Sequence, residues 1–201
     1  MNEEIQKQFF PMKLPSDTVA HMMDQDAARE PINAINHLIF PPGFKQVLGL
    51  FAAPETRRKG LEHLQQQHAY SQPEWIVFYH QDEPIGWFLG YMEDPETFFI
   101  DTIGLVPAFR EQGIYSAFLR QLIACLGAMG YERLTTNHHP NNRAALIADL
   151  KAGFDIVGLE LHESHGPLVK MAYHLHRDRR LAFERVFSMT RESPDQGDLL
   201  P

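Results

Sequence analysis

The spacing of apolar residues changes near residue 75 and divides the chain into two parts. From Trp75 onward, aliphatic and aromatic runs alternate with polar turns rich in Pro, Gly, Asp and Glu. Such runs predict strands, because β-branched and aromatic side chains suit a pleated, half-buried surface. The predicted strands cover 75–79, 85–91, 98–106, 133–138, 156–161 and 168–175. Apolar residues at helical spacing predict helices near 112–129, 143–151 and 178–190. The pattern favours a mixed α+β fold.

The first 70 residues have a less regular pattern, interrupted by prolines. A short strand is predicted within residues 1–15. Ser16-Asp17 then predicts the N-cap of a helix, which must end before Pro31 because proline disrupts a helix interior. Two further helices are predicted at 44–51 and 54–68. This part of the chain is therefore expected to be mostly helical.

Composition narrows the class of protein. The chain has 201 residues and a formal net charge of −8, which argues against nucleic acid as a partner. Its single cysteine, Cys125, rules out an intramolecular disulfide, and neither a cysteine cluster nor a His-Glu-x-x-His pattern suggests a metal site. No apolar run has membrane-spanning length, and none follows the acidic N-terminus, so a cytoplasmic protein without a signal peptide is expected. We expect one domain over residues 1–190 and a disordered polar tail over 191–201.

The turn between the 98–106 strand and the following helix carries candidate chemistry. A helix that begins after Arg110-Glu111-Gln112-Gly113-Ile114 presents unpaired N–H groups and a partial positive charge. Gly113 lets an anion approach the backbone, and Arg110 adds a cation. The turn therefore predicts a cradle for a phosphate or pyrophosphate. The alternative is an ordinary strand–helix turn with a surface arginine.

A second motif follows at a fixed separation. The 133–138 strand leads to Asn142-Arg143-Ala144-Ala145 and, at the helix end, to Lys151-Ala152-Gly153-Phe154. With Leu105-Val106-Pro107 and Arg110 to Tyr115, these residues resemble the GNAT superfamily of N-acetyltransferases. The matching motifs cover about a quarter of the chain, and the order of elements over 75–177 agrees with the resemblance.

The resemblance implies a central, mostly antiparallel twisted sheet of about six or seven strands, with a splayed strand pair and flanking helices. It implies transfer of an acetyl group from acetyl-CoA to the primary amine of a small molecule, peptide or protein. Free backbone groups near Leu105 and Val106 would pair with pantetheine. The implied regions are an acceptor side at 16–70, a coenzyme-binding core at 75–177 and a C-terminal helix at 178–190. The implied coenzyme-binding residues are Leu105, Val106, Arg110, Glu111, Gln112, Gly113, Ile114, Tyr115, Ser116, Asn142 and Lys151.

Two residues depart from the family pattern. Tyr115 stands where the pattern has Gly or Ala, and Asp149 stands where many members carry a tyrosine that protonates the departing thiolate. Asp149 is either an acid with a raised pKa or a solvated helix residue. These departures keep open an alternative function, a coenzyme A-binding regulatory or sensor module.

The candidate catalytic residues are His138, Asp149 and Asp101. Histidine suits deprotonation of an ammonium through water. His138 and His139 are the candidate bases of this type, but neighbouring side chains on a strand point in opposite directions, so only one can face the site. The sequence leaves open the acceptor and the oligomeric state, a homodimer included.

Overall fold

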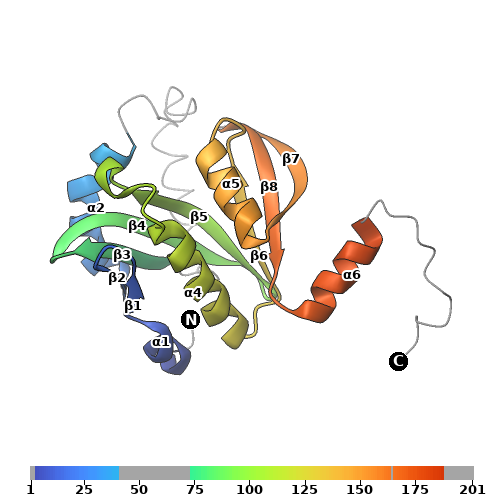
Figure 1. The fold of residues 1–201 in the computed structure, drawn as a ribbon, viewed down its shortest axis with the longest axis horizontal. Coiled ribbons are helices and arrows are strands. Elements are labelled where there is room, and N and C mark those ends of the chain that lie inside the picture. The colour runs from blue at the N-terminus through green and yellow to red at the C-terminus, as the bar shows by residue number, and fades with distance from the viewer. Residues whose placement is uncertain (1–2, 41–72, 164, 188–201) are drawn as a thin grey trace, which may run out of the picture.

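The computed structural model describes residues 3–40, 73–163 and 165–187, which form an α+β fold around one eight-stranded sheet (Figure 1). The strand order is β1-β2-β3-β4-β5-β6-β8-β7. Only β5 and β6 pair in parallel, and every other neighbouring pair is antiparallel. The strands are β1 Met12–Leu14, β2 Thr18–Met23, β3 Glu74–His80, β4 Glu83–Asp94, β5 Thr97–Leu105, β6 Arg133–His138, β7 Asp155–His162 and β8 Gly166–His174. All six strands predicted from residue 75 onward are confirmed.

Helices cover both faces of the sheet. The helices are α1 Glu3–Phe9, α2 Gln25–Ile39, α4 Ile114–Ala128, α5 Arg143–Ala152 and α6 Arg177–Phe187. α4 and α5 lie on one face, and α2 lies on the other (Figure 1). The apolar stripe of α4, including Phe118 and Leu122, packs against Phe78, Phe88 and Phe98 of the sheet in the larger core cluster. The fold therefore places the predicted anion-binding turn, Arg110 to Ile114, above the middle of the sheet.

The N-terminal region differs from the prediction. Ser16 and Asp17 do not cap a helix; their φ angles of 57° and 51° form the turn between β1 and β2. The short strand predicted within residues 1–15 corresponds to β1, but β2 replaces the first part of the expected helix. The turn between them uses left-handed conformations without glycine, so composition did not mark a hairpin. Its two strands bring the sheet to eight, beyond the six or seven expected.

The first long helix also runs through the residue expected to stop it. α2 begins at Gln25, where the Asp24 side chain accepts a hydrogen bond of 2.8 Å from Ala27 N, and continues past Pro31. Proline costs one backbone hydrogen bond here. The buried stripe of α2, packed against Val77 and Trp87, offsets this loss. That stripe consists of Ala28, Ile32, Ile35 and Ile39.

Several predictions concern residues outside the described part of the chain. These are the helices at 44–51 and 54–68, the last residues of the C-terminal helix and the polar tail at 191–201. Among the described residues, no helix is long and apolar enough to cross a membrane.

Candidate functional site

The parallel strands β5 and β6 pair over only part of their length. Thr97–Ile100 pair with Arg133–Thr136, after which β5 continues to Leu105 and β6 pairs only with β8. Asp101 is an extra residue in β5, because Gly90 faces Ile100 and Leu89 faces Thr102. Such a bulge bends a strand and increases its local twist. The two strands diverge beyond this point (Figure 1), as the resemblance predicted.

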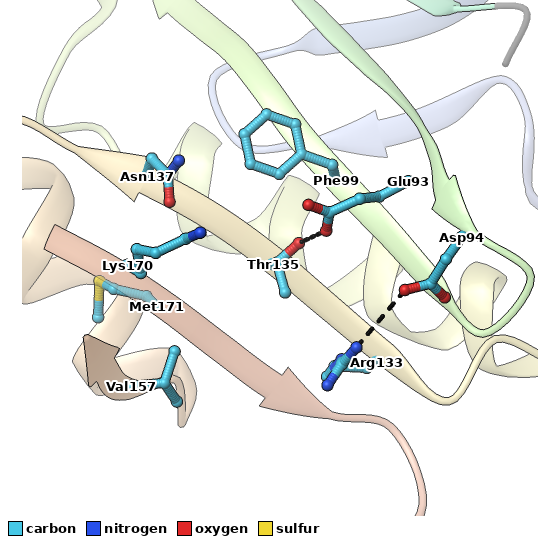
Figure 2. Close-up of a pocket in the computed structure, with 9 residues that line it drawn as sticks. All are labelled: Glu93, Asp94, Phe99, Arg133, Thr135, Asn137, Val157, Lys170 and Met171. Atoms are coloured by element: carbon cyan, nitrogen blue, oxygen red, sulfur yellow. Dashed lines mark hydrogen bonds and ion pairs between the residues drawn. The ribbon is translucent and has the colours of Figure 1, made fainter. Parts of the chain in front are cut away.

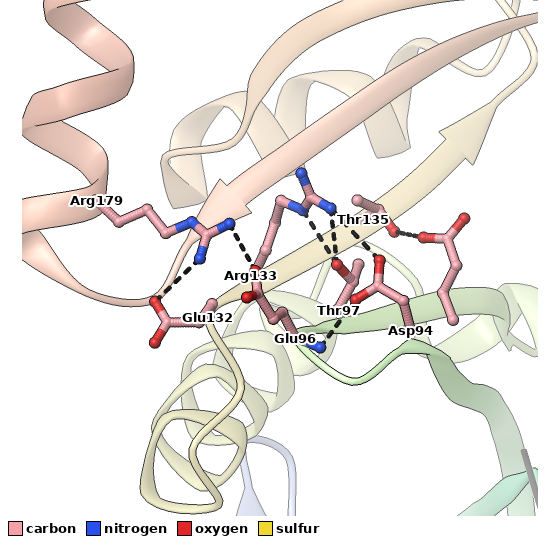
Figure 3. Close-up of polar contacts among 8 residues, drawn as sticks. Asp94, Glu96, Thr97, Glu132, Arg133, Thr135 and Arg179 are labelled. Atoms are coloured by element: carbon pink, nitrogen blue, oxygen red, sulfur yellow. Dashed lines mark hydrogen bonds and ion pairs between the residues drawn. The ribbon is translucent and has the colours of Figure 1, made fainter.

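Polar contacts fix the closed end of this strand pair (Figure 3). Arg133 Nε and Nη2 donate to the buried Thr97 Oγ1 at 3.2 and 2.9 Å, and Arg133 lies 3.6 Å from Asp94 Oδ2. Thr136 Oγ1 donates to the Ile100 carbonyl at 3.1 Å, at the last parallel pair. From α6, Arg179 contacts Glu96 and Glu132 at the same end. We call the gap between the diverging parts of β5 and β6 the opening. These contacts hold the strands together at its Thr97–Arg133 end, whereas its other end, toward Leu105, is free.

The turn before α4 lies beside the open end of β5. A 3-10 turn, η2 Pro107–Phe109, leads to Glu111 with φ of 62° and Gly113 with φ of 77°. Gly113 is exposed, and a Cβ built on it would meet no atom within 4 Å. Glycine is required here by its left-handed conformation rather than by crowding. The space beside Gly113 therefore leaves room for an anion near the unpaired N–H groups of the first turn of α4.

Two predicted coenzyme contacts are already used within the protein. Arg110 Nε donates to the Leu105 carbonyl at 2.9 Å, and Arg110 Nη2 donates to the Ile39 carbonyl at 3.4 Å. Val106 N donates to the Ile85 carbonyl of β4 at 2.8 Å. The Val106 N–H therefore pairs with β4, so a coenzyme contact near Leu105 and Val106 would have to use other backbone groups. Arg110 ties the end of β5 to the end of α2, while its side chain stays exposed.

A buried carboxylate joins α4, α5 and β6. Asp149 has 0% exposure; its Oδ1 accepts from the Tyr115 hydroxyl, and its Oδ2 lies 2.6 Å from His138 Nε2. Asp149 is thus not the solvated helix residue considered above. Burial, followed by the charge and hydrogen bond of Asp149, raises the pKa of Tyr115 well above its ordinary value. Tyr115 therefore keeps its proton at neutral pH and acts as the donor to Asp149.

The opposite face of the sheet contains a pocket of about 270 Å³ (Figure 2). Thr135 and Asn137 point into it, because they alternate along β6 with the buried Leu134 and Thr136. Asn137 Oδ1 is buried without a hydrogen-bond partner among the described residues. Glu93 Oε2 accepts from Thr135 Oγ1 at 2.8 Å. The remaining lining residues are Asp94, Phe99, Arg133, Val157, Lys170 and Met171.

Comparison with known proteins identifies the family. A family model described as "Acetyltransferase (GNAT) family" matches residues 44–154, more than half of the chain. The chain belongs to this family. No curated protein sequence matches it significantly.

Solved GNAT structures have the same fold at low sequence identity. An N-acetyltransferase from Staphylococcus aureus Mu50 is 18% identical with a TM-score of 0.55, covering 80% of this chain and 100% of its own. A ribosomal-protein-S18-alanine N-acetyltransferase from Escherichia coli is 14% identical with a TM-score of 0.55, covering 79% and 94%. A GNAT acetyltransferase from Elizabethkingia anophelis, solved with acetyl-CoA bound, is 18% identical with a TM-score of 0.52, covering 79% and 99%.

Several predicted site residues have structural partners in this GNAT chain. Asn142 caps α5, with Oδ1 accepting from Ala145 N at 3.4 Å, and Lys151 is exposed in the last turn of α5. Gln112 Nε2 donates to the Ala108 carbonyl at 2.8 Å. Along the turn, Glu111, Gln112 and Ser116 are exposed. Ile114, by contrast, is buried and anchors the first turn of α4, so only its backbone can face a ligand.

The catalytic candidates separate into two groups. His138 and Asp149 are in contact on the face covered by α4, whereas His139 is exposed beyond the end of β6. Asp101 is exposed and accepts from Thr102 Oγ1 at 2.8 Å. Burial and then the charges of Asp101 and Glu93 raise the pKa of Tyr91, which places Asp101 with the pocket-side residues. Among the described residues, Asp101 makes its side-chain hydrogen bond to Thr102 and none to the His138–Asp149 pair.

Sequence reasoning missed the contact between Tyr115 and Asp149. Both residues had been noted as separate departures from the family pattern. One signal could have indicated this contact. Position 115 carries a large polar side chain, position 149 carries a carboxylate, and both lie on helices that cover the same face of the sheet.

Proposed function

We propose that this chain transfers an acetyl group from acetyl-CoA to a primary amine by direct attack in a ternary complex. One observation carries the proposal: β5 runs on without a β6 partner beside the exposed N-terminus of α4. An unpaired strand edge can hydrogen-bond an extended amide chain such as pantetheine. A helix N-terminus opened by Gly113 suits the pyrophosphate at the other end of the same molecule.

The coenzyme-binding role of the turn rests on exposed groups. The space beside the Cβ position of Gly113 is open, and Arg110 has guanidinium N–H groups beyond those bonded to Leu105 and Ile39. A thioester held against the β5 backbone would have its carbonyl polarised by a fixed N–H, which needs backbone geometry alone. The Val106 N–H is unsuitable because it already serves β4. The segment from Asp101 to Leu105 is therefore the part of β5 assigned to this task.

The amine acceptor is assigned to the pocket on the other face. Glu93 and Asp94 offer carboxylate oxygens there, and Asn137 Oδ1 offers a buried acceptor that no described residue uses. These groups suit an ammonium or amine N–H. Asn137 directly follows the last β6 residue paired with β5, so the pocket adjoins the opening. The coenzyme and the acceptor would thus approach from opposite faces and meet where the strands diverge.

Calorimetric titration with acetyl-CoA, using ATP and NAD as controls, tests the proposal. We expect saturable binding of acetyl-CoA alone, and release of free thiol with one or more members of an amine panel. Arg110→Ala should weaken binding about tenfold, because a charge-assisted hydrogen bond is lost. Arg120→Ala removes an exposed arginine elsewhere on α4 and should leave the affinity unchanged. No binding at millimolar coenzyme would refute the proposal.

The alternative, a coenzyme-binding sensor, is favoured by one observation. Asp149 stands at the position of the family's thiolate-protonating tyrosine. Its carboxylate is buried and accepts hydrogen bonds instead of supplying a proton. Selective binding without turnover of any amine would support this alternative. Turnover would exclude it.

A further inference from the structure

The two departures from the family pattern are in contact with each other. Tyr115 begins α4 and Asp149 lies on α5, and the tyrosine hydroxyl donates to the aspartate. Asp149 is completely buried, yet both of its oxygens have partners. A buried carboxylate without such partners would be strongly unfavourable. Tyr115 and Asp149 therefore act as one unit. The second partner of Asp149, His138, is the residue that this unit holds in place.

The hydrogen bonds determine which nitrogen of His138 carries the proton. An ionised carboxylate only accepts, so its partner at Oδ2 must donate. Tyr115 occupies Oδ1 and leaves Oδ2 for His138 Nε2. A neutral imidazole that donates from Nε2 has its lone pair on Nδ1. Tyr115 and Asp149 together therefore select the tautomer whose basic nitrogen is Nδ1.

His138 also lies at the right place for proton transfer. It is the last residue of β6 and lies opposite Val169 of β8, beyond the segment that pairs with β5. It shares the α4 face of the sheet with Leu134 and Thr136. Its side chain is 10% exposed, whereas that of Asp149 is 0% exposed. Of these two side chains, the imidazole is therefore the one that solvent or a ligand in the opening can reach.

We propose that His138 carries the proton from the attacking amine to the departing thiolate, and that Tyr115 and Asp149 are positioning residues that hold its tautomer. The inference rests on the acetyl transfer proposed above. The amine nitrogen forms a bond to the carbonyl carbon, and the carbon–sulfur bond breaks with its electron pair on sulfur. The proton released by nitrogen moves to Nδ1 and then to sulfur, giving the amide and free thiol. Because nitrogen and sulfur bind the same carbon, one imidazole can serve both.

Asp149→Asn makes the sharpest test, because the Tyr115 O–H donates to this residue and favours the orientation in which the new amide keeps its oxygen toward Tyr115. The amide oxygen still accepts from Tyr115, so the amide N–H₂ faces His138 Nε2 and donates to it. The imidazole proton must then move to Nδ1, where the lone pair was needed. We expect turnover to fall about 100-fold or more, with the KM for acetyl-CoA little changed. Tyr115→Phe removes the hydrogen bond that orients the Asp149 carboxylate but adds no donor beside His138. We expect turnover of this variant to fall about tenfold.

Ring nitrogen-15 spectra of histidine-labelled protein, recorded where the imidazole is neutral, test the tautomer directly. His138→Gln assigns the signal. We expect the Nε2–H form in the wild type and the Nδ1–H form in Asp149→Asn. Tyr115→Phe should keep the Nε2–H form, because the Asp149 carboxylate still only accepts. Tyr131→Phe removes a hydroxyl from a residue beyond the end of α4 and should change neither the spectrum nor the rate.

These readouts separate the two proposals. The spectra require no acetyl transfer, so the expected tautomers without turnover of any amine would overturn the proposed function while the positioning roles stand. If transfer is measured, full activity in His138→Gln overturns the proton-carrying role. A wild-type Nδ1–H form, or an unchanged tautomer in Asp149→Asn, overturns the positioning roles. If Asp149→Asn does not fold, Tyr115→Phe decides: an unchanged rate, or the Nδ1–H form in this variant, would refute the inference.

Discussion

Gly104 of β5 lies directly against Ile39, the last residue of α2: a Cβ built on Gly104 would lie 2.3 Å from Ile39 Cγ2 and 3.4 Å from Phe40 Cζ. The same end of α2 receives the Arg110 guanidinium at the Ile39 carbonyl. The close approach of α2 to the unpaired part of β5 therefore depends on the missing side chain at position 104.

Gly104→Ala should destabilise the fold, because a methyl group cannot fit without moving the end of α2. Overpacking of this kind costs about 1–3 kcal/mol in the free energy of unfolding, measured by chemical denaturation. Gly127→Ala is the matched control: it lies inside α4, and its Cβ would meet nothing within 4 Å. The control should gain about 0.5–1 kcal/mol from helix propensity. Equal effects of the two substitutions would contradict the crowding at Gly104.

The sequence predicted the sheet from residue 75 onward because its strands carry long apolar or alternating runs that only a buried sheet satisfies. It missed the β1–β2 hairpin, whose first strand has three residues and whose turn uses left-handed Ser16 and Asp17. It also ended α2 at Pro31, since burial against the sheet is invisible in the local pattern.

The candidate site divides in the same way. The turn around Gly113 was predictable because a strand, a cationic turn and a helix follow one another in the chain. The contact between Tyr115 and Asp149 was not, because it depends on how α4 packs beside α5 across 34 residues of sequence. Likewise, the loss of the Val106 N–H to Ile85 follows from the pairing register, which the sequence did not specify.

Thr97→Val should loosen the closed end of the strand pair. Thr97 is fully buried and accepts from two nitrogens of Arg133. The substitution removes both of these hydrogen bonds and leaves Nη2 with Asp94 at 3.6 Å. We expect a loss of about 1–2 kcal/mol in the free energy of unfolding. Thr135→Val removes a hydroxyl that donates to the exposed Glu93, and its effect should stay within about 0.5 kcal/mol. If both variants unfold at the same denaturant concentration, the anchoring role of Thr97 is wrong.

Tyr115 and Asp149 should also be coupled in stability, whatever the chemistry of the site. Tyr115→Phe removes one of two hydrogen bonds to a buried carboxylate and should cost about 1–3 kcal/mol. In a double-mutant cycle with Asp149→Ala, which removes the acceptor, we expect a coupling energy of about 1 kcal/mol, because the residues are in contact. Denaturation of the four proteins at one pH measures this energy. Strict additivity of the two single effects would contradict the contact.

Cys125 should make the stability of the fold sensitive to alkaline pH. It is fully buried in α4, and burial followed by the charge of Glu74 raises the pKa of its thiol from 9.0 to about 11. The unfolded chain therefore loses this proton near pH 9, whereas the folded chain keeps it until about pH 11. Between these values unfolding releases a proton, so the stabilisation is fully present below pH 9 and is lost as the pH rises toward 11.

Comparison with Cys125→Ala isolates this contribution from other groups that titrate at alkaline pH. The variant loses some packing at every pH, but its free energy of unfolding should fall less steeply over the alkaline range than that of the wild type. The slopes should differ by up to about 1.4 kcal/mol per pH unit, the linkage of one proton. The wild-type thiol should also resist alkylation at neutral pH until the protein unfolds, because both burial and protonation suppress its reactivity. Parallel slopes, or rapid alkylation of the folded protein, would show that the thiol ionises as freely in the fold as in the unfolded chain.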